Sequence, residues 1–221
     1  MTKTKTLVKI CGITTEQQAV QIAQLGADAI GIISVEESPR YIPAKSKRKI
    51  FKTLESLYPK IERVSVLKNC PIDLIINNFL GSPSETIIQL HGDEDLDYCK
   101  KIKREIPNIG IWKAFRIKKK TDLEKIKPYE NFIDAILLDS WNNKTYGGSG
   151  KKIPSTYLEN LKFNKPWWLA GGISLEWIDE ILNNIKPHGL DISSSVEIRP
   201  GLKDIEKTAQ LIKYLDQISN Y

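Results

Sequence analysis

Short apolar runs alternate with amphipathic stretches along the whole chain. Eight runs rich in Ile, Val and Leu predict strands buried on both faces, and they cover residues 7–10, 29–33, 64–67, 87–90, 111–115, 135–138, 167–170 and 190–192. The stretches between them have apolar residues at helical spacing and predict helices over 16–25, 45–57, 74–80, 96–106, 122–127, 175–185 and 205–218, with a brief one near 155–161. Such alternation favours parallel strands joined by right-handed crossovers.

The number of alternations and the length of the chain predict one fold. No linker or shift in composition divides the 221 residues, of which 41% are hydrophobic, enough for one large core. We therefore expect a single α/β domain over residues 1–221, a (β/α)8 TIM barrel. No apolar run reaches the roughly 18 residues of a membrane span, and the first residues form no apolar signal segment. These features predict a cytoplasmic protein without a membrane partner.

Charge and cysteine content narrow the possible partners. A net charge of +6 attracts anions, but the basic residues are mixed with acidic ones in helical stretches and no nucleic-acid motif accompanies them, so we expect no nucleic-acid partner. The three cysteines, Cys11, Cys70 and Cys99, have no repeated spacing and predict no disulfide framework. Cys70 and Cys99 are expected to be small apolar residues on helix faces. With only two histidines, we predict no metal site.

Two reactive side chains end predicted strands. Cys11 follows the first strand and Asp139 the sixth, so a barrel would bring both to the rim formed by the carboxyl ends of its strands. A thiol acts as a base only as a thiolate, which requires a lowered pKa, and a carboxyl acts as an acid near neutral pH only with a raised pKa. Such a pair could move a proton between carbon and oxygen of a sugar. The alternatives are packing for Cys11 and loop capping for Asp139.

The last two strands end in glycine and serine. Gly171 and Gly172 precede a predicted helix, and a run of three serines (Ser193, Ser194 and Ser195) follows the eighth strand. In barrels, the loops after strands seven and eight often bind phosphate through backbone N–H groups and helix N-termini. Glycine permits close approach and serine adds donors. The pair of loops predicts a phosphate site, although each alone could be an ordinary turn.

Three further features point to the same rim. Arg40 follows the rigid Pro39, and its planar fork suits a carboxylate or phosphate. His91 ends the fourth strand. The glycine-rich residues 146–150 suit a loop that closes over a ligand. A surface arginine, a structural histidine and a plain linker are the respective alternatives.

Taken together, the motifs resemble one enzyme family, phosphoribosylanthranilate isomerase of tryptophan biosynthesis. The stretches that resemble it are Lys9-Ile10-Cys11-Gly12-Ile13-Thr14, Gly26-Ala27-Asp28-Ala29-Ile30-Gly31, Ser38-Pro39-Arg40-Tyr41, Gln89-Leu90-His91-Gly92, Leu138-Asp139-Ser140, Gly147-Gly148-Ser149-Gly150, Leu169-Ala170-Gly171-Gly172-Ile173, Asp191-Ile192-Ser193-Ser194 and Pro200-Gly201-Leu202-Lys203-Asp204. Each is short, but they follow the family's order over nearly the whole chain.

The resemblance implies a cofactor-free aldose–ketose isomerase that acts on a small phosphorylated substrate, as a monomer or homodimer. The implied reaction is the Amadori rearrangement of N-(5-phosphoribosyl)anthranilate to 1-(2-carboxyphenylamino)-1-deoxyribulose 5-phosphate. By this resemblance Asp139 protonates the ribose ring oxygen, Cys11 removes the C2′ proton and Arg40 holds the anthranilate carboxylate. His91 and Asp191 would line the substrate site. The phosphate would be held by Gly171, Gly172, Ser193, Ser194 and Ser195.

One departure and three alternatives accompany this interpretation. Ser195 stands where the family usually has glycine, which would cost about 1 kcal/mol if the backbone there needs a positive φ. A related sugar-phosphate isomerase of histidine biosynthesis would have aspartate in place of Cys11. A barrel that only binds phosphorylated ligands would lack Cys11 or Asp139. A nucleic-acid binder is the third alternative.

Overall fold

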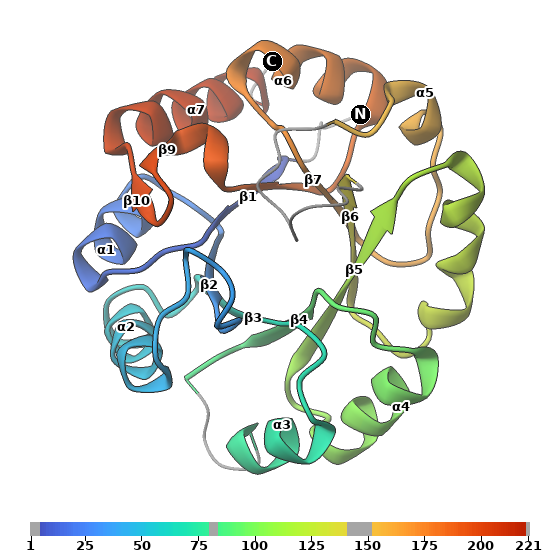
Figure 1. Cartoon of the computed structure of the whole chain (residues 1–221). Coiled ribbons are helices and arrows are strands. Elements are labelled where there is room, and N and C mark those ends of the chain that lie inside the picture. Colours follow the sequence, from blue (N-terminus) through green and yellow to red (C-terminus); the bar gives the residue numbers. More distant parts are fainter. Residues whose placement is uncertain (1–4, 80–83, 141–151, 220–221) are drawn as a thin grey trace.

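Eight parallel strands close into a barrel in the order of the sequence, with the last strand hydrogen-bonded to the first. The structure is a computed structural model and describes residues 5–79, 84–140 and 152–219. The strands form the inner ring seen in Figure 1. They are β1 (Leu7–Cys11), β2 (Ala29–Ile33), β3 (Glu62–Leu67), β4 (Ile87–Leu90), β5 (Gly110–Ile117), β6 (Ala135–Ser140), β7 (Trp167–Ala170) and β8 (Gly189–Ile192). All eight predicted strands and the TIM-barrel fold are confirmed.

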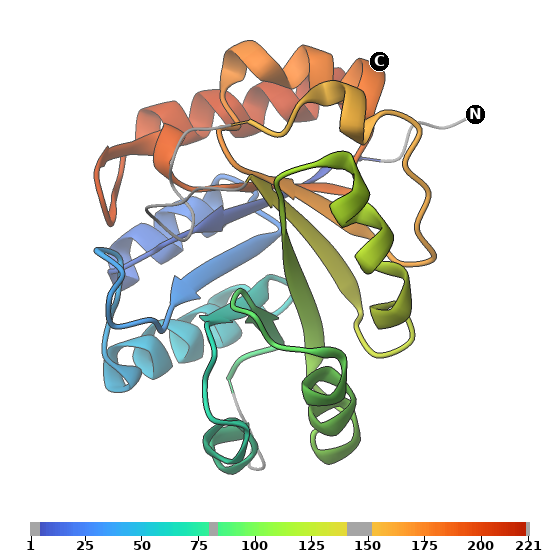
Figure 2. The same cartoon turned by 45° about the vertical axis from the view of Figure 1, so that its right-hand side comes forward.

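Helices surround the barrel, as the turned view in Figure 2 also shows. They are α1 (Glu16–Gln24), α2 (Ala44–Leu57), α3 (Ile72–Phe79), α4 (Leu96–Glu105), α5 (Ser155–Leu158), α6 (Leu175–Glu180) and α7 (Ile205–Ser219). Thr15 caps α1 by accepting a hydrogen bond from the backbone N–H of Gln18 at 3.3 Å. Among the described helices, none has the length and apolar character that crossing a membrane requires.

Three segments differ from the predicted elements. The predicted helix at 122–127 is instead a pair of 3-10 helices, η1 (Lys120–Lys125) and η2 (Lys127–Tyr129). The Asp122 carboxylate accepts the backbone N–H groups of Lys118 and Lys119 and so tightens the first turn, and Pro128 cannot supply the N–H that an α-helix would need. The helix predicted at 175–185 ends as α6 and continues as a π-helical turn, η3 (Ile181–Ile185).

The third difference lies after β8. The sequence predicted no element between β8 and the last helix, but a 3-10 helix η4 (Ser194–Val196) is followed by a hairpin of β9 (Glu197–Arg199) and β10 (Leu202–Lys203). The hairpin lies beside α1 and α7 (Figure 1). The backbone N–H of Lys203 donates to Gln18 Oε1 of α1 at 2.7 Å. With three and two residues, these strands are too short to carry a periodic signal.

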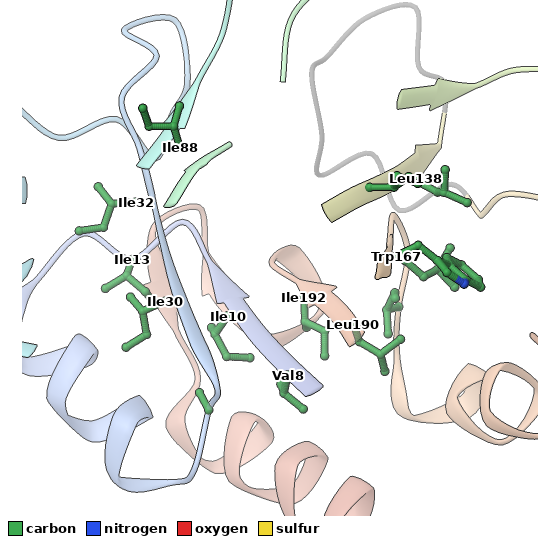
Figure 3. Close-up of a cluster of buried hydrophobic side chains, with 14 of the residues drawn as sticks. Val8, Ile10, Ile13, Ile30, Ile32, Ile88, Leu138, Trp167, Leu190 and Ile192 are labelled. Carbon is green, nitrogen blue, oxygen red and sulfur yellow. The ribbon is translucent and has the colours of Figure 1, made fainter. Parts of the chain in front are cut away.

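The main hydrophobic core lies between the barrel and its helices. Alternate strand residues, such as Val8 and Ile10 of β1, face this layer, part of which is shown in Figure 3. The residues between them face the barrel interior, where a second apolar cluster includes Val64, Leu137 and Trp168. Because the two faces alternate, Lys9 and Cys11 of β1 both point inward. This parity places the reactive side chains inside the barrel.

Candidate active site

A cavity of about 420 Å³ opens at the carboxyl ends of the strands. Cys11 is the last residue of β1, Asp139 lies near the end of β6 and His91 directly follows β4. The cavity is lined by all ten residues that the sequence singled out: Cys11, Arg40, His91, Asp139, Gly171, Gly172, Asp191, Ser193, Ser194 and Ser195. The fold therefore brings every candidate residue to one site. The glycine-rich segment at 146–150 lies outside the described residues.

Cys11 is buried, with only 7% of its surface exposed. Burial raises the pKa of its thiol, the positive charges of Lys9 and Lys203 oppose this effect, and the Asp191 carboxylate adds to it. The net result is a raised pKa, and the cations of Lys9 and Lys203 are the groups that favour the thiolate. The physical reason is that desolvation of the thiolate outweighs the nearby cations.

Asp139 is held by two donors. Its Oδ1 accepts the backbone N–H of Ser140 at 2.8 Å, and its Oδ2 lies 3.2 Å from His91 Nε2. On the far side of the imidazole, His91 Nδ1 lies 2.8 Å from Gln89 Nε2. An amide nitrogen can only donate, so Nδ1 accepts and Nε2 carries the proton that faces Asp139. Gln89 therefore sets the His91 tautomer at the carboxyl group.

Asp191 faces the cavity from β8. Its Oδ2 accepts a hydrogen bond from the Lys9 ammonium at 2.9 Å, whereas its Oδ1 is buried and has no hydrogen-bond partner among the described residues. A buried carboxylate oxygen without a donor costs free energy. A substrate hydroxyl placed in the cavity could donate to this oxygen.

Arg40 enters the cavity already paired with a carboxylate. Its Nε and Nη2 donate to the two Glu197 oxygens at 2.9 and 2.6 Å. Lys203 Nζ donates to the same carboxylate at 2.8 Å. Although burial opposes the charge of Glu197, Arg40 and Lys203 hold its pKa below the ordinary value. This pairing uses one edge of the guanidinium and leaves its other nitrogen, Nη1, for a ligand.

The close fit around Arg40 depends on Gly12. A Cβ at this position would lie 2.5 Å from Arg40 Cδ, and the backbone φ of Gly12 is +84°. Both observations require glycine directly after Cys11. No pattern in the sequence points to this role of Gly12.

The two loops predicted to bind phosphate border the cavity. Gly171 and Gly172 have φ values of +86° and +65°, as only glycine adopts readily. Ser193 Oγ donates to the backbone oxygen of Cys11 at 3.0 Å and so joins this loop to β1. Ser195 lies in η4 and is not among the residues with positive φ, so the strain considered for serine there does not arise. The hairpin separates these serines from α7, whose N-terminus is therefore not part of this loop.

Four further residues of the site did not emerge as candidates from the sequence. They are Lys9, Gln89, Glu197 and Lys203, all of which bond to a candidate residue. Lys9 and Gln89 could have been inferred from Cys11 and His91. Residues two apart on a strand share a face, so each pair points into the barrel together. Glu197 and Lys203 come from the unpredicted hairpin. Within the described ranges, no three histidine, cysteine or carboxylate side chains group as metal ligands would.

A closed parallel barrel with ionisable side chains gathered at its carboxyl rim defines a TIM-barrel enzyme. Comparison with known proteins gives the particular family. Residues 8–214 match the family model described as N-(5'phosphoribosyl)anthranilate (PRA) isomerase. The chain belongs to the phosphoribosylanthranilate isomerase family.

Individual relatives agree with the family model. The chain is 41% identical over 212 residues to the N-(5'-phosphoribosyl)anthranilate isomerase of Crocosphaera subtropica, covering 96% of this chain and 99% of that one. The crystal structure of phosphoribosyl anthranilate isomerase from Thermotoga maritima has a TM-score of 0.84 and 31% identity, covering 96% and 99% of the two chains. A phosphoribosyl anthranilate isomerase in complex with reduced 1-(o-carboxyphenylamino)-1-deoxyribulose 5-phosphate has a TM-score of 0.77 and 30% identity, with the same coverage.

Proposed function

We propose that this chain converts N-(5'-phosphoribosyl)anthranilate into 1-(2-carboxyphenylamino)-1-deoxyribulose 5-phosphate, the aldose–ketose isomerisation of tryptophan biosynthesis, with Asp139 as general acid and Cys11 as general base. Membership of the isomerase family supports the reaction. The observation that carries the assignment of residues is that Cys11 and Asp139, from β1 and β6, line the same cavity.

The reaction needs one proton donor and one proton acceptor. Asp139 gives a proton to the ribose ring oxygen, the C1′–O bond breaks, and the anilino nitrogen lone pair forms the C1′=N bond of a protonated Schiff base. The Cys11 thiolate then takes the C2′ proton, and the C2′–H electron pair forms the C1′=C2′ bond of an enolamine while nitrogen recovers its lone pair. Tautomerisation of the enolamine gives the ketone. Both steps are general acid–base catalysis.

Binding is assigned to the remaining residues of the cavity. Arg40 Nη1 would hold the anthranilate carboxylate, which suits a guanidinium. The backbone at Gly171 and Gly172, with Ser193, Ser194 and Ser195, would hold the phosphate. Asp191 Oδ1, which has no partner among the described residues, would accept a ribose hydroxyl. His91 lines the site and orients Asp139.

Substitution of the two reactive residues tests the assignment. Cys11→Ser keeps the size but is a far weaker base, and Asp139→Asn removes the acid, so each should lower kcat about 10²-fold or more with KM little changed. Turnover is followed by the loss of fluorescence of freshly generated substrate. Cys70→Ser, a half-buried thiol outside the cavity, is the matched control. Near-normal kcat in either test variant would refute its role.

The physiological setting follows from the same proposal. The partner is a small phosphorylated substrate. All three cysteines are free, as suits a reducing compartment, and we propose a cytoplasmic location. Assembly as a monomer or homodimer, and the absence of a nucleic-acid partner, stay predictions.

A further inference from the structure

Lys9 is the least expected residue of the barrel interior. It lies in the middle of β1 between the apolar Val8 and Ile10, and its side chain is fully buried. Lysine is almost never fully buried unless it is paired, because desolvating an ammonium is costly. A chain that retains lysine here has contacts that compensate this cost, and those contacts belong to the candidate active site.

The ammonium of Lys9 donates to one side chain from across the barrel, Gln89 of β4, and to one from the neighbouring strand, Asp191 of β8. Nζ lies 2.6 Å from Gln89 Oε1 and 2.9 Å from Asp191 Oδ2. The first contact turns the amide nitrogen of Gln89 toward His91. The second neutralises one oxygen of Asp191. An ammonium has three donors, so one remains.

Cys11 also lies close to the Lys9 side chain. Cys11 lies two residues further along β1 and shares its inward face. Gly31 of β2 lies beside both, because a Cβ there would be 2.7 Å from Cys11 Sγ and 2.9 Å from Lys9 Cε. Thiol and lysine stem therefore occupy the same small space above Gly31. Burial opposes the charge of Lys9, but Asp191 and the negative charge of a Cys11 thiolate outweigh it and raise the pKa of Lys9.

The charges around Cys11 are unequal. Three cations lie on this side of the cavity: Lys9 of β1, Arg40 after β2 and Lys203 of β10. Two carboxylates face them, Asp191 of β8 and Glu197 of β9. His91 and Asp139 are hydrogen-bonded to each other at the ends of β4 and β6. Among Lys9, Arg40, Lys203, Asp191 and Glu197 the cations outnumber the carboxylates by one, and a Cys11 thiolate would supply the missing negative charge.

We propose that Lys9 is a positioning residue for the reaction, whose buried ammonium is the counter-charge that stabilises the Cys11 thiolate. The proposal rests on the role of Cys11 as general base. Gln89 and Asp191 hold the ammonium in place, and Gly31 leaves the space that the lysine stem and the sulfur occupy.

The test measures the ionisation of Cys11 without turnover. The rate of iodoacetamide alkylation at Cys11 is followed against pH, and mass spectrometry of the Cys11 peptide separates it from Cys70. Lys9→Met removes the charge and keeps the length, so the midpoint should rise by about one pH unit or more, the usual effect of one close opposite charge. Lys113→Met is the matched control, since it breaks another buried pair, with Glu94 at 3.0 Å, outside the cavity.

A second comparison keeps the proposal testable if Lys9→Met does not fold, since that variant leaves Asp191 buried without its cation. Asp191→Asn should lower the midpoint, because the Asp191 charge raises the pKa of Cys11. Adding Lys9→Met to Asp191→Asn leaves no unpaired charge from this pair and should raise the midpoint again by about one pH unit. Equal midpoints in Asp191→Asn and the double variant would overturn the proposal.

Activity gives an independent readout. If Lys9 acts through the thiolate, kcat/KM of Lys9→Met at neutral pH should fall about tenfold for each pH unit by which the alkylation midpoint rises, and it should recover as the pH is raised. A loss that is the same at every pH would mean a merely structural role and contradict the proposal. Near-normal turnover in Cys11→Ser would instead remove the base role itself, whatever the alkylation profiles show.

Discussion

Arg40 shows how one side chain can be both buried and available. Its guanidinium is bonded to Glu197 through two nitrogens, and the residue still lines the cavity. The Glu197 contact raises the pKa of Arg40, so its charge is permanent. A side chain that is already fixed loses less conformational entropy when a ligand binds. The alternative of a plain surface arginine does not hold, because Arg40 is buried and bonded to Glu197.

Replacement of Arg40 should therefore affect binding of the substrate carboxylate. Arg40→Ala should weaken substrate affinity by roughly 1.5–3 kcal/mol, the usual value of a hydrogen bond to a charged group. KM and the inhibition constants of two substrate analogues, with and without the anthranilate carboxylate, check this. The analogue without the carboxylate should lose little. Arg199→Ala, an exposed arginine of β9 outside the cavity, is the control, and equal losses for both analogues would contradict the assignment.

Among the elements of the fold, the loops after β7 and β8 border the same cavity. Gly171 and Gly172 adopt positive φ after β7, and the serine run after β8 turns into η4. Ser193 is bonded to the backbone of Cys11 and to the Lys203 ammonium, which donates to its backbone oxygen at 3.0 Å. The loop that we propose binds phosphate is thus joined to the strand that bears the thiol.

This arrangement predicts that inorganic phosphate inhibits competitively by occupying the loops. Gly172→Val should abolish the inhibition, because a β-branched residue is strained at a φ of +65° and would block close approach of an anion. Ser195→Gly should leave it largely intact, since the backbone N–H remains. The inhibition constants for phosphate are measured in the two variants and in the parent protein. Unchanged inhibition in Gly172→Val would argue against the site.

At the scale of the whole molecule, closure of the barrel depends on packing inside it. The rings of Trp112 and Trp168 lie 4.6 Å apart in the barrel interior, and the Lys9 ammonium is 6.0 Å from the Trp112 ring. The polar layer of the site therefore rests on an aromatic layer. Gly189 of β8 makes room for it, because a Cβ there would lie 2.4 Å from the Trp168 ring.

Gly189→Ala should therefore destabilise the fold by about 1–3 kcal/mol, the usual cost of overpacking. For a chain of this length the melting temperature should fall by roughly 2–4 °C per kcal/mol. Thermal unfolding followed by circular dichroism gives the melting temperature and the change in the free energy of unfolding. Combining Gly189→Ala with Trp168→Leu should destabilise by less than the sum of the single variants, because the smaller side chain relieves the overlap. Strict additivity would show that the two residues do not compete for space.

The pattern of apolar and polar residues predicted the elements well where no other group competes for their backbone hydrogen bonds. The eight strands appear where their apolar runs predicted them, and Thr15 caps α1 as its residue type suggested. The errors occur where another group competes for the backbone. Asp122 and Pro128 turned a predicted α-helix into η1 and η2, and the hairpin after β8 is stabilised by contacts with α1 that lie 185 residues away in sequence.

Local sequence patterns were enough to predict the barrel and the rim at which its reactive side chains lie. Strand periodicity is a local property, and in a closed parallel barrel every strand end reaches the same rim, so Cys11 and Asp139 could be assigned to one site. Which charged side chains bond to one another depends on the three-dimensional fold. Lys9 bonds to Gln89 and Asp191, 80 and 182 residues away, and Arg40 bonds to Glu197, 157 residues away. Gln89 lies across the barrel on β4, Asp191 on the neighbouring strand β8 and Glu197 in the hairpin. No local pattern encodes these contacts, because they depend on strand register and on the removal of water from the interior.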